Sequence, residues 1–397
     1  MRRQKWNSLC CLGLAALLAA ASPGAVRAAS LSDYDEETQA KLLDDTLEYS
    51  EIRARVSLYN PTLSQARITM DDAMSIYRNG MTEYKDRAAE LRRKADEAEE
   101  DGDLLTYAAY EMNAQIMNEL ANQYKDVVEQ SERMSTQRSI VSAEDLLTRG
   151  VQQMVQGYFQ LDLGCTIAEK GVELAEAAYN STVTQQGLGM ATEADVKAAE
   201  NSLASARASL ASAQASRASL KSSICLMTGW DYDADITIGP VPEPDMEAIA
   251  AADLEADTEK AVNNNYDLIA IRHQSRATST PAQETRDRNL RDTEASIRIA
   301  MGSLYETLLQ QRAAKEGADA AWQKAVNDKN ALDQKYQLGM VGRLEYLQGE
   351  VAYLQAQSAK QTADINLRKA YEDYLWQVKG VSVASTAAGS TQTASAQ

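Results

Sequence analysis

Apolar side chains in this 397-residue chain recur at alternating spacings of three and four residues over long stretches. One such seam runs from Leu147 to Tyr179, and a second runs from Val196 to Ala213. A mean period of 3.5 residues is typical of helices that pack against other helices along their whole length. The spacing therefore predicts long coiled helices. The members of the two seams are Leu147, Val151, Met154, Tyr158, Leu161, Cys165, Ala168, Val172, Ala175 and Tyr179, then Val196, Ala199, Leu203, Ala206, Leu210 and Ala213.

The same rhythm returns nearer the C-terminus, from Ile297 to Leu308 and from Leu344 to Leu354. Gln311, Lys315 and Lys329 interrupt it, so we expect imperfect packing at those positions. The stretch 283–338 contains no proline, and a helix of roughly 56 residues would be about 84 Å long. Such a helix is too long for a compact bundle, so the sequence predicts an elongated molecule.

An internal repeat relates the two halves of the chain. Gly189-Met190 matches Gly339-Met340 at an offset of 150 residues. Gly229 follows the first of these glycines by 40 residues, and Gly380 follows the second by 41. A recurring bend followed at the same distance by a terminal glycine indicates two tandem copies of one antiparallel helical hairpin.

Proline, glycine and composition divide the chain into six segments. The repeats open alike, with Asn60-Pro61-Thr62-Leu63 in the first and Asn265-Tyr266-Asp267-Leu268 in the second. Between them, the Pro-rich run 239–244 cannot be helical. The predicted segments are a signal peptide (1–28), an N-terminal helical segment (29–59), a first hairpin repeat (60–229), a Pro-rich linker (230–258), a second hairpin repeat (259–380) and a disordered tail (381–397).

The N-terminus reads as a secretory signal peptide. A positive segment at 2–5 precedes an apolar stretch at 9–21 and a small-residue cleavage site at 25–28. A lipid anchor on Cys10 or Cys11 is the alternative, but a lipidated cysteine should follow the apolar stretch. We therefore expect export to the cell envelope.

Charge and motifs argue against nucleic-acid binding and catalysis. Removal of the signal takes away four of 40 basic residues, which leaves 36 against 58 acidic residues, a net charge of −22. No basic footprint for nucleic acid remains. His273 is the only histidine, and no zinc, Walker or dinucleotide motif is present. We expect no enzyme activity, no cofactor and no metal.

Cys165 and Cys225 are expected to be buried thiols on apolar seams. In a hairpin bent near Gly189 they would differ in height by 12 residues, or about 18 Å along a helix. That separation is too large for a disulfide within the hairpin.

The bends and the helix ends carry a pattern that occurs in both repeats: Gly189, Asp195-Val196, Met227-Thr228-Gly229, Gly339, Glu345-Tyr346 and Val378-Lys379-Gly380. In this pattern the chain resembles the TolC family of outer-membrane efflux proteins. The resemblance covers the mature chain in order and is best over 165–229 and 320–380. It implies an all-α fold of elongated antiparallel coiled-coil hairpins in two tandem repeats, assembled as a homotrimeric twelve-helix tunnel. It also implies docking to a periplasmic adaptor (membrane fusion) protein and an inner-membrane transporter.

The sequence departs from that family where membrane strands would be expected. Each strand needs about 9–11 residues of alternating polarity, but 84–94 reads as a charged helix, and 104–132 as another helix after the Asp101–Asp103 turn. We therefore predict little or no β-barrel and an extra acidic helix pair at 84–132. The pair is either a replacement for the barrel or a docking arm. The protein would lie in the outer membrane, as the family does, or in the envelope without membrane insertion.

The bends are the candidate functional sites. By the resemblance, the adaptor would dock on the hairpin tips, and the tunnel entrance would narrow at Glu345, Gln348 and Asp195. Simpler structural readings compete with both. Thr192 and Asp195 form a capping box, and Glu345 is an ordinary first-turn carboxylate. The tip residues are Gly187, Gly189, Met190, Gly339, Met340 and Gly342.

Two functions follow from these observations. The first is a channel component of an efflux or secretion system that works with an adaptor and a pump. The alternative is a secreted coiled-coil structural protein of the envelope that does not transport.

Overall fold

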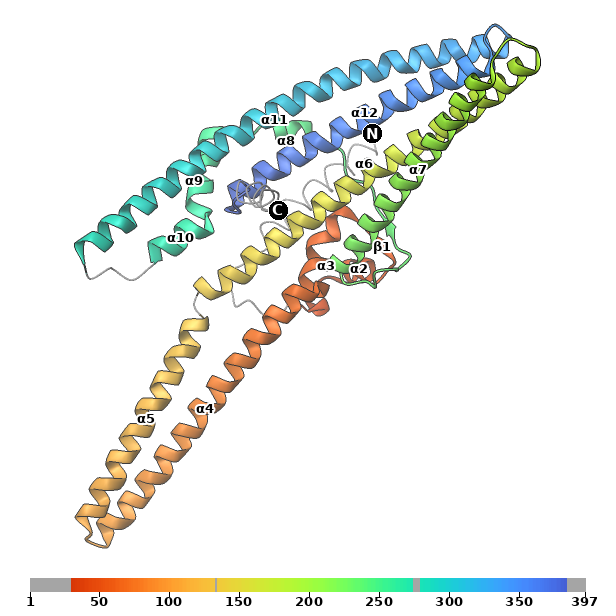
Figure 1. The fold of residues 1–397 in the computed structure, drawn as a ribbon. Helices are drawn as coiled ribbons and strands as arrows, with labels where there is room; N and C mark the ends of the chain where they lie inside the picture. The colour runs from red at the N-terminus through yellow and green to blue at the C-terminus, as the bar shows by residue number, and fades with distance from the viewer. Residues whose placement is uncertain (1–29, 133, 274–278, 384–397) are drawn as a thin grey trace. The chain divides into compact units, whose positions relative to one another are not determined.

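The computed structural model describes residues 30–132, 134–273 and 279–383, and it is built almost entirely of helices (Figure 1). The all-α prediction is confirmed. The predicted signal peptide lies outside the described residues. The elements are η1 (Leu31–Asp33), α2 (Glu36–Leu42), β1 (Thr46–Leu47), η2 (Tyr49–Glu51), α3 (Ile52–Tyr59), α4 (Pro61–Glu100), α5 (Leu104–Glu132), α6 (Met134–Gly187), α7 (Glu193–Met227), β2 (Thr237–Ile238), α8 (Met246–Ala250), α9 (Leu254–Asn264), α10 (Tyr266–His273), α11 (Thr280–Gln337) and α12 (Arg343–Lys379).

Within the described segments, the only strands are β1 and β2, which pair in parallel. Thr46 lies opposite Thr237, and Leu47 lies opposite Ile238. None of the described helices carries an apolar stretch long enough to cross a lipid bilayer.

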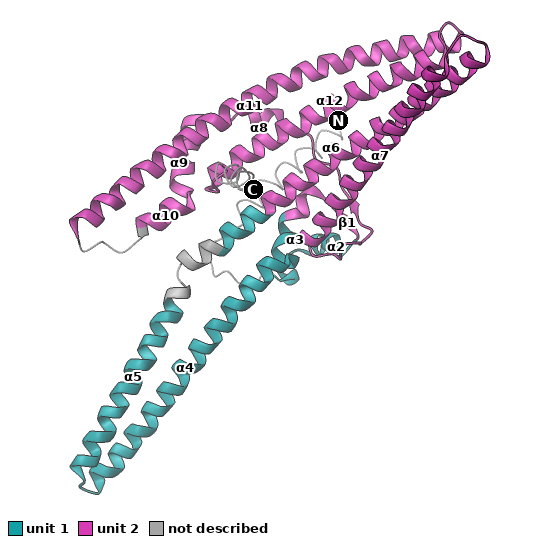
Figure 2. Cartoon of the chain, in the orientation of Figure 1, with its two compact units in different colours: residues 1–44, 53–147 teal, residues 45–52, 148–397 magenta. Residues whose placement is uncertain are grey.

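The chain forms two compact units (Figure 2). Unit 1 comprises Met1–Asp44 and Arg53–Leu147, and unit 2 comprises Asp45–Ile52 and Thr148–Gln397. The chain therefore passes from unit 1 to unit 2, back to unit 1, and again to unit 2.

Unit 1 contains the hairpin of α4 and α5, which occupies the region where the family resemblance called for membrane strands. The predicted helix pair is confirmed, although α4 begins at Pro61, well before the predicted start at 84. Asn60 starts α4 by accepting a hydrogen bond from the Leu63 N–H at 3.1 Å, and Gly102 bends the chain with φ +78°. Most of the residues buried along the pair are alanines: Ala88, Ala95, Ala98, Ala114 and Ala121. Small side chains allow the two helices to approach closely.

In unit 2, four long helices lie side by side in the order α7, α6, α12, α11 (Figure 1). Neighbouring helices in this layer are antiparallel. The contacts that fix the order are the Arg217–Asp162 ion pair between α7 and α6, the 3.2 Å Gln160–Asn366 hydrogen bond between α6 and α12, and the Trp322 and Tyr353 rings of α11 and α12 with centroids 4.9 Å apart.

The predicted repeat is visible in matching backbone geometry. Asn265 caps α10 as Asn60 caps α4, by accepting from the Leu268 N–H at 2.9 Å. Gly229 and Gly380 both have positive φ, at +84° and +106°. The residue after each glycine donates its N–H to a carbonyl five residues back, at 2.9 and 3.0 Å. This pattern is the Schellman motif.

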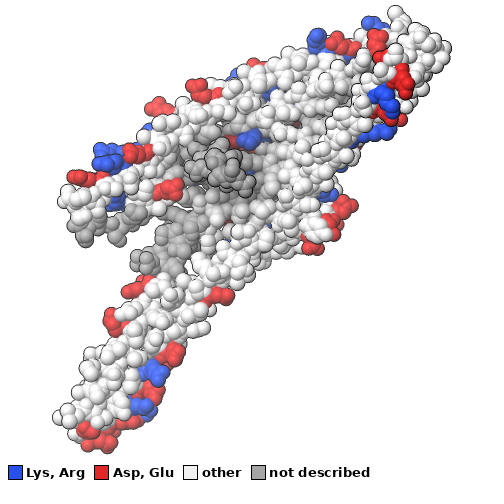
Figure 3. Space-filling model, in the orientation of Figure 1, with Lys and Arg blue, Asp and Glu red and all other residues white. Residues whose placement is uncertain are grey.

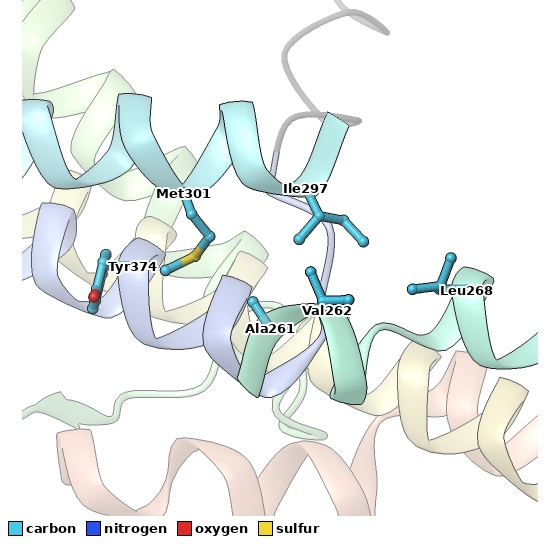
Figure 4. Packing of buried hydrophobic residues seen from close by; sticks show 6 residues of the cluster. All are labelled: Ala261, Val262, Leu268, Ile297, Met301 and Tyr374. Atoms are coloured by element: carbon cyan, nitrogen blue, oxygen red, sulfur yellow. The ribbon is translucent and has the colours of Figure 1, made fainter. Parts of the chain in front are cut away.

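A buried apolar cluster in the second repeat joins α9, α10, α11 and α12 (Figure 4). Val262 and Ile297 point toward each other across α9 and α11, and Tyr374 of α12 is fully buried. The cluster fixes the opening of the repeat against its last helix. Its members are Ala261, Val262, Leu268, Ile297, Met301 and Tyr374.

Three features differ from or refine the sequence predictions. The predicted linker contains β2 and α8, and α9 begins within it at Leu254. The predicted tail begins with a buried residue, Val381, whose N–H donates to the Trp376 carbonyl at 3.0 Å; 384–397 lie outside the described residues. Cys165 and Cys225 are buried free thiols, as predicted.

Candidate functional site: the bend end of unit 2

Both bends of unit 2 lie at the same end of the helix layer (Figure 1). Arg343, in the first turn of α12, pairs with Glu173 near the end of α6 at 2.9 Å. Far along the same two helices, Arg149 pairs with Asp373, also at 2.9 Å. Because α6 and α12 run antiparallel, the end of one and the start of the other meet. The Gly189 and Gly339 bends are thereby brought together, as the repeat required.

The two bends share one backbone conformation. Gly189 has φ +74° and Gly339 has φ +70°, a region that glycine enters without strain. The Met190 N–H donates to the Gln185 carbonyl, and the Met340 N–H donates to the Lys335 carbonyl, each at 2.8 Å. The turn geometry therefore explains the glycine of each Gly-Met pair.

Each bend exposes two large apolar side chains. Met190 is 75% exposed and Met340 is 68% exposed, and each follows an exposed leucine, Leu188 at 71% and Leu338 at 75%. Glycine accounts for the turn, but nothing in the turn requires Leu or Met beside it. Gly187 and Gly342, the other predicted tip residues, are exposed as well.

The helices that leave the bends begin differently. Thr192 and Asp195 form the predicted capping box at α7: the Asp195 carboxylate accepts from the Thr192 N–H at 2.8 Å, and the Asp195 N–H donates to Thr192 Oγ1 at 3.2 Å. The hydrogen bond from the Thr192 side chain lowers the pKa of Asp195. Helix α12 has Gly342 at its N-cap position, without any side-chain cap.

The three predicted constriction residues lie on two different helices. Glu345 and Gln348 lie one turn apart at the start of α12, and both are exposed. Asp195 belongs to α7, where its carboxylate serves the cap. Glu345 and Gln348 therefore lie together in the α11/α12 hairpin, whereas Asp195 belongs to the other hairpin, α6/α7.

A chain of charged groups links three helices behind the bends. Lys170 of α6 lies 3.6 Å from Glu350 of α12, which is 3.9 Å from Lys329 of α11. Lys329 also pairs with Asp333 and donates to the Tyr346 hydroxyl at 3.1 Å. Sequence reasoning missed this chain, because its members lie up to 180 positions apart.

Lys315 and Lys329, which interrupt the apolar seam of α11, are held by ion pairs. Both ammonium groups are largely shielded and paired: Lys315 lies 2.7 Å from Asp319 and 3.0 Å from Asp364. Burial alone would lower the pKa of Lys329, but its hydrogen bonds with Asp333 and Tyr346 raise it. The lysines therefore lock α11 against α12 through charge instead of apolar contact.

A second polar cluster is buried near the other end of α12. The Tyr49 hydroxyl donates to Glu372 at 2.6 Å, and Gln156 Nε2 donates to both groups at 2.9 Å. Burial raises the pKa of Glu372, although Arg368, 2.7 Å away, opposes the shift. The cluster holds η2 of unit 2 against α6 and α12.

No protein-family model matches this chain, and no curated protein matches it. Solved structures with a similar arrangement of helices include CusC, described with transmembrane channel formation (15% identical, 77% of this chain and 96% of that one, TM-score 0.45). The Campylobacter jejuni CmeC outer-membrane channel is 13% identical, the match covers 67% of this chain and 71% of that one, and the TM-score is 0.43. A membrane protein from Pseudomonas aeruginosa is 13% identical, the match covers 88% of this chain and 97% of that one, and the TM-score is 0.42.

Proposed function

We propose that this chain is a channel component of the cell envelope, in which unit 2 of three copies closes around a common axis. The observation that carries the proposal is the single layer of four antiparallel helices whose two bends share one conformation and one end. A closed ring of such layers is a tube with all its bends at one mouth. Efflux or secretion through that tube, with an adaptor and an inner-membrane transporter, is the function it fits.

Incomplete burial of the seams supports closure by further copies. On α7, Leu203 is buried, but Val196, Ala199 and Leu210 of the same seam are only half-buried. At the other edge of the layer, on α11, Ile299 is 73% exposed. A seam with a 3.5-residue period is stabilised by helices on both sides. Neighbouring copies would supply the missing side at α7 and α11.

The exposed apolar tips support docking of an adaptor at the mouth. Met is adaptable and common at binding surfaces, and four large apolar side chains gather on the two bends. Glu345 and Gln348, exposed one turn behind the second bend, are suited to narrow the entrance. Three Glu345 carboxylates near one axis would repel each other and favour cations.

The assembly is tested by the mass and low-resolution shape of the exported protein, in detergent-free buffer and in detergent. A particle of three chains with a central channel supports the proposal. A monomer or dimer in both buffers contradicts the proposal and favours the alternative, a coiled-coil structural protein of the envelope that does not transport.

The docking site is tested with Met190→Glu and Met340→Glu in one chain. We expect loss of cross-linking to a purified adaptor and loss of export, with the trimer intact. The control is Tyr232→Glu, which is 65% exposed and lies away from the bends and outside α7 and α11. Unchanged cross-linking in the tip variant would remove the bends as the docking site.

A further inference from the structure

Helix α5 of unit 1 carries two separate heptad seams. The inner seam repeats every seven residues, at Ala114, Ala121 and Val128, and all three are buried. It faces α4, and the Tyr124 ring packs edge-on against Tyr77 with centroids 5.4 Å apart. The hairpin is therefore closed by this seam.

The second seam lies on another face of α5 and is unpartnered in the described part of unit 1. Leu105, Ala109, Met112 and Ile116 follow at spacings of four, three and four residues. Leu105 is 86% exposed, Met112 60% and Ile116 48%, and Ala109 is also exposed. Scattered apolar residues on a surface need no explanation, but four in heptad register form a surface that fits a helix.

The bend and the α5 face that carry this outer seam are acidic, while Arg92, Arg93 and Lys94 stand on the neighbouring helix α4. No Lys or Arg occurs from position 95 to position 124, which includes the bend and the whole seam. Figure 3 shows acidic side chains over the tip of this hairpin. The formal charge of the segment is −8, from Asp96, Glu97, Glu99, Glu100, Asp101, Asp103, Glu111 and Glu119.

We propose that the outer seam of α5 (Leu105, Ala109, Met112 and Ile116) is a docking site for a basic amphipathic helix of a partner protein. The heptad register selects a helix, and the exposed Leu, Met and Ile select an apolar face on it. The acidic rim selects Lys or Arg at the positions that flank that face.

Charge decides among the possible occupants. A second copy of the same tip would bring −8 against −8 in register, which raises the free energy of association. An anionic lipid surface is repelled for the same reason. A basic helix gains from both the apolar contact and the charge. The seam spans three helical turns, about 17 Å, so a partner segment of about 12–15 residues covers it.

The test uses the full exported chain and two designed helical peptides. Both peptides carry Leu and Ile at their a and d positions, and they differ only in having Lys or Glu at e and g. Fluorescence anisotropy measures binding at low and moderate salt. We expect the Lys peptide to bind at least tenfold more tightly than the Glu peptide, with affinity that falls as salt rises.

The seam is tested by a triple variant, Leu105→Gln, Met112→Gln and Ile116→Gln. Because these side chains are exposed, the helical content and melting temperature should be unchanged, while the Lys peptide binds at least tenfold more weakly. The matched control is Ile68→Gln with Ile76→Gln, which alters exposed apolar residues of α4 in the same unit and should leave binding unchanged. A charge reversal, Glu111→Lys with Glu119→Lys, should shift preference toward the Glu peptide.

Three results would each overturn the proposal. Equal binding of the two peptides removes the charge selection, and equal loss in the triple variant and the α4 control removes the seam. Self-association that the triple variant abolishes, measured as a concentration-dependent mass, assigns the seam to a second copy. The proposal does not depend on channel function, so a failed trimer test leaves it standing.

Discussion

The α4/α5 hairpin of unit 1 and the α11/α12 hairpin of unit 2 bend in the same way but are closed differently. Gly102 and Gly339 have φ +78° and +70°. In each bend the residue after the glycine donates to a carbonyl five residues back, at 2.9 and 2.8 Å. Along α4/α5 most of the buried residues are alanines, with Leu63, Arg67 and Val128 as the exceptions. Gly80 leaves room for the Tyr124 ring, since a Cβ there would lie 2.7 Å from it. Along α11/α12 the contacts are large aromatic and aliphatic side chains and paired lysines.

The difference shows that residues at the bend determine the bend geometry. The spacing of the two helices is determined by the volume of the side chains buried between them. Alanines complete a two-helix coil without help, so α4/α5 buries its own seam. Large side chains hold helices farther apart and leave grooves that other helices fill. Leu308 of α11 accordingly packs with Ile249 of α8 and Leu367 of α12. Unit 2 therefore depends on more than one hairpin.

The largest expected effect is at Leu308, which is 1% exposed. Leu308→Ala should lower the free energy of unfolding of unit 2 by about 3 kcal/mol, through lost apolar burial and a residual cavity. Hydrogen exchange by mass spectrometry should show faster exchange in α11 and α12, with α4 and α5 unchanged. Equal loss of protection in both hairpins would break the comparison, because it would make them one cooperative unit.

The opposite change tests the alanine seam. Ala114→Leu should destabilise the α4/α5 hairpin by about 2 kcal/mol, because the closely approaching helices have no room for three more carbons. Ala109→Leu is the control, since it lies on the exposed face of the same helix. Chemical denaturation monitored by hydrogen exchange measures both. If the Ala114→Leu hairpin were as stable as the wild type, the spacing between α4 and α5 would leave room for side chains larger than alanine.

Paired charges should matter in α11/α12 and not in α4. A double-mutant cycle with Lys315→Gln and Asp364→Asn should give a coupling of about 1 kcal/mol, because both side chains are mostly shielded from water, at 16% and 17% exposed. The comparison cycle uses Arg93→Gln and Glu97→Gln, a surface pair at 65% and 59% exposed, with coupling expected within experimental error. Similar coupling energies in the two cycles would contradict the distinction.

The smallest effect concerns the helix starts. Asp103 begins α5 by accepting from the Thr106 N–H at 3.1 Å and from the Thr106 hydroxyl at 2.6 Å, and these bonds lower its pKa below 3.8. A lowered pKa stabilises the folded state above pH 3.8, and this stabilisation is lost as the pH falls through the folded pKa. Protection of the first turn of α5 should therefore decrease on acidification.

Asp103→Asn is the control for that titration, because Asn also caps helices but does not ionise. Its first-turn protection should not change with pH in this range. If Asp103→Asn followed the wild-type pH dependence, another carboxylate would be responsible. The first turn of α12, which has no side-chain cap, gives a comparison within the same protein.

Local signals in the sequence predicted most of the fold. The Asp101–Asp103 turn and the start of α5 at Leu104 follow from glycine and capping chemistry within a few residues. The seams gave the helices, and the repeat of Gly-Met gave the two bends. These features depend on backbone geometry that neighbouring residues determine.

What the sequence did not reveal depends on partners distant in the chain. Lys315 and Lys329 looked like interruptions of the seam, because periodicity alone cannot show that each lysine pairs with a carboxylate on another helix, Asp364 or Glu350. Tyr49 gave no signal of its bond to Glu372. The α5 outer seam was also overlooked, because its four positions are two residues out of phase with the seam that closes the hairpin.

The seven-residue recurrence of alanine in α4 and α5 has a consequence for how long this arm is. Ala88 and Ala95 on one helix, and Ala114 and Ala121 on the other, are buried at equivalent positions of successive heptads. Adding or deleting one matched heptad on each helix keeps the alanine seam on the face that meets the partner helix, and it leaves the Gly102 bend unchanged. The arm's reach can thus change in steps of about 10 Å while the rest of the chain keeps its sequence.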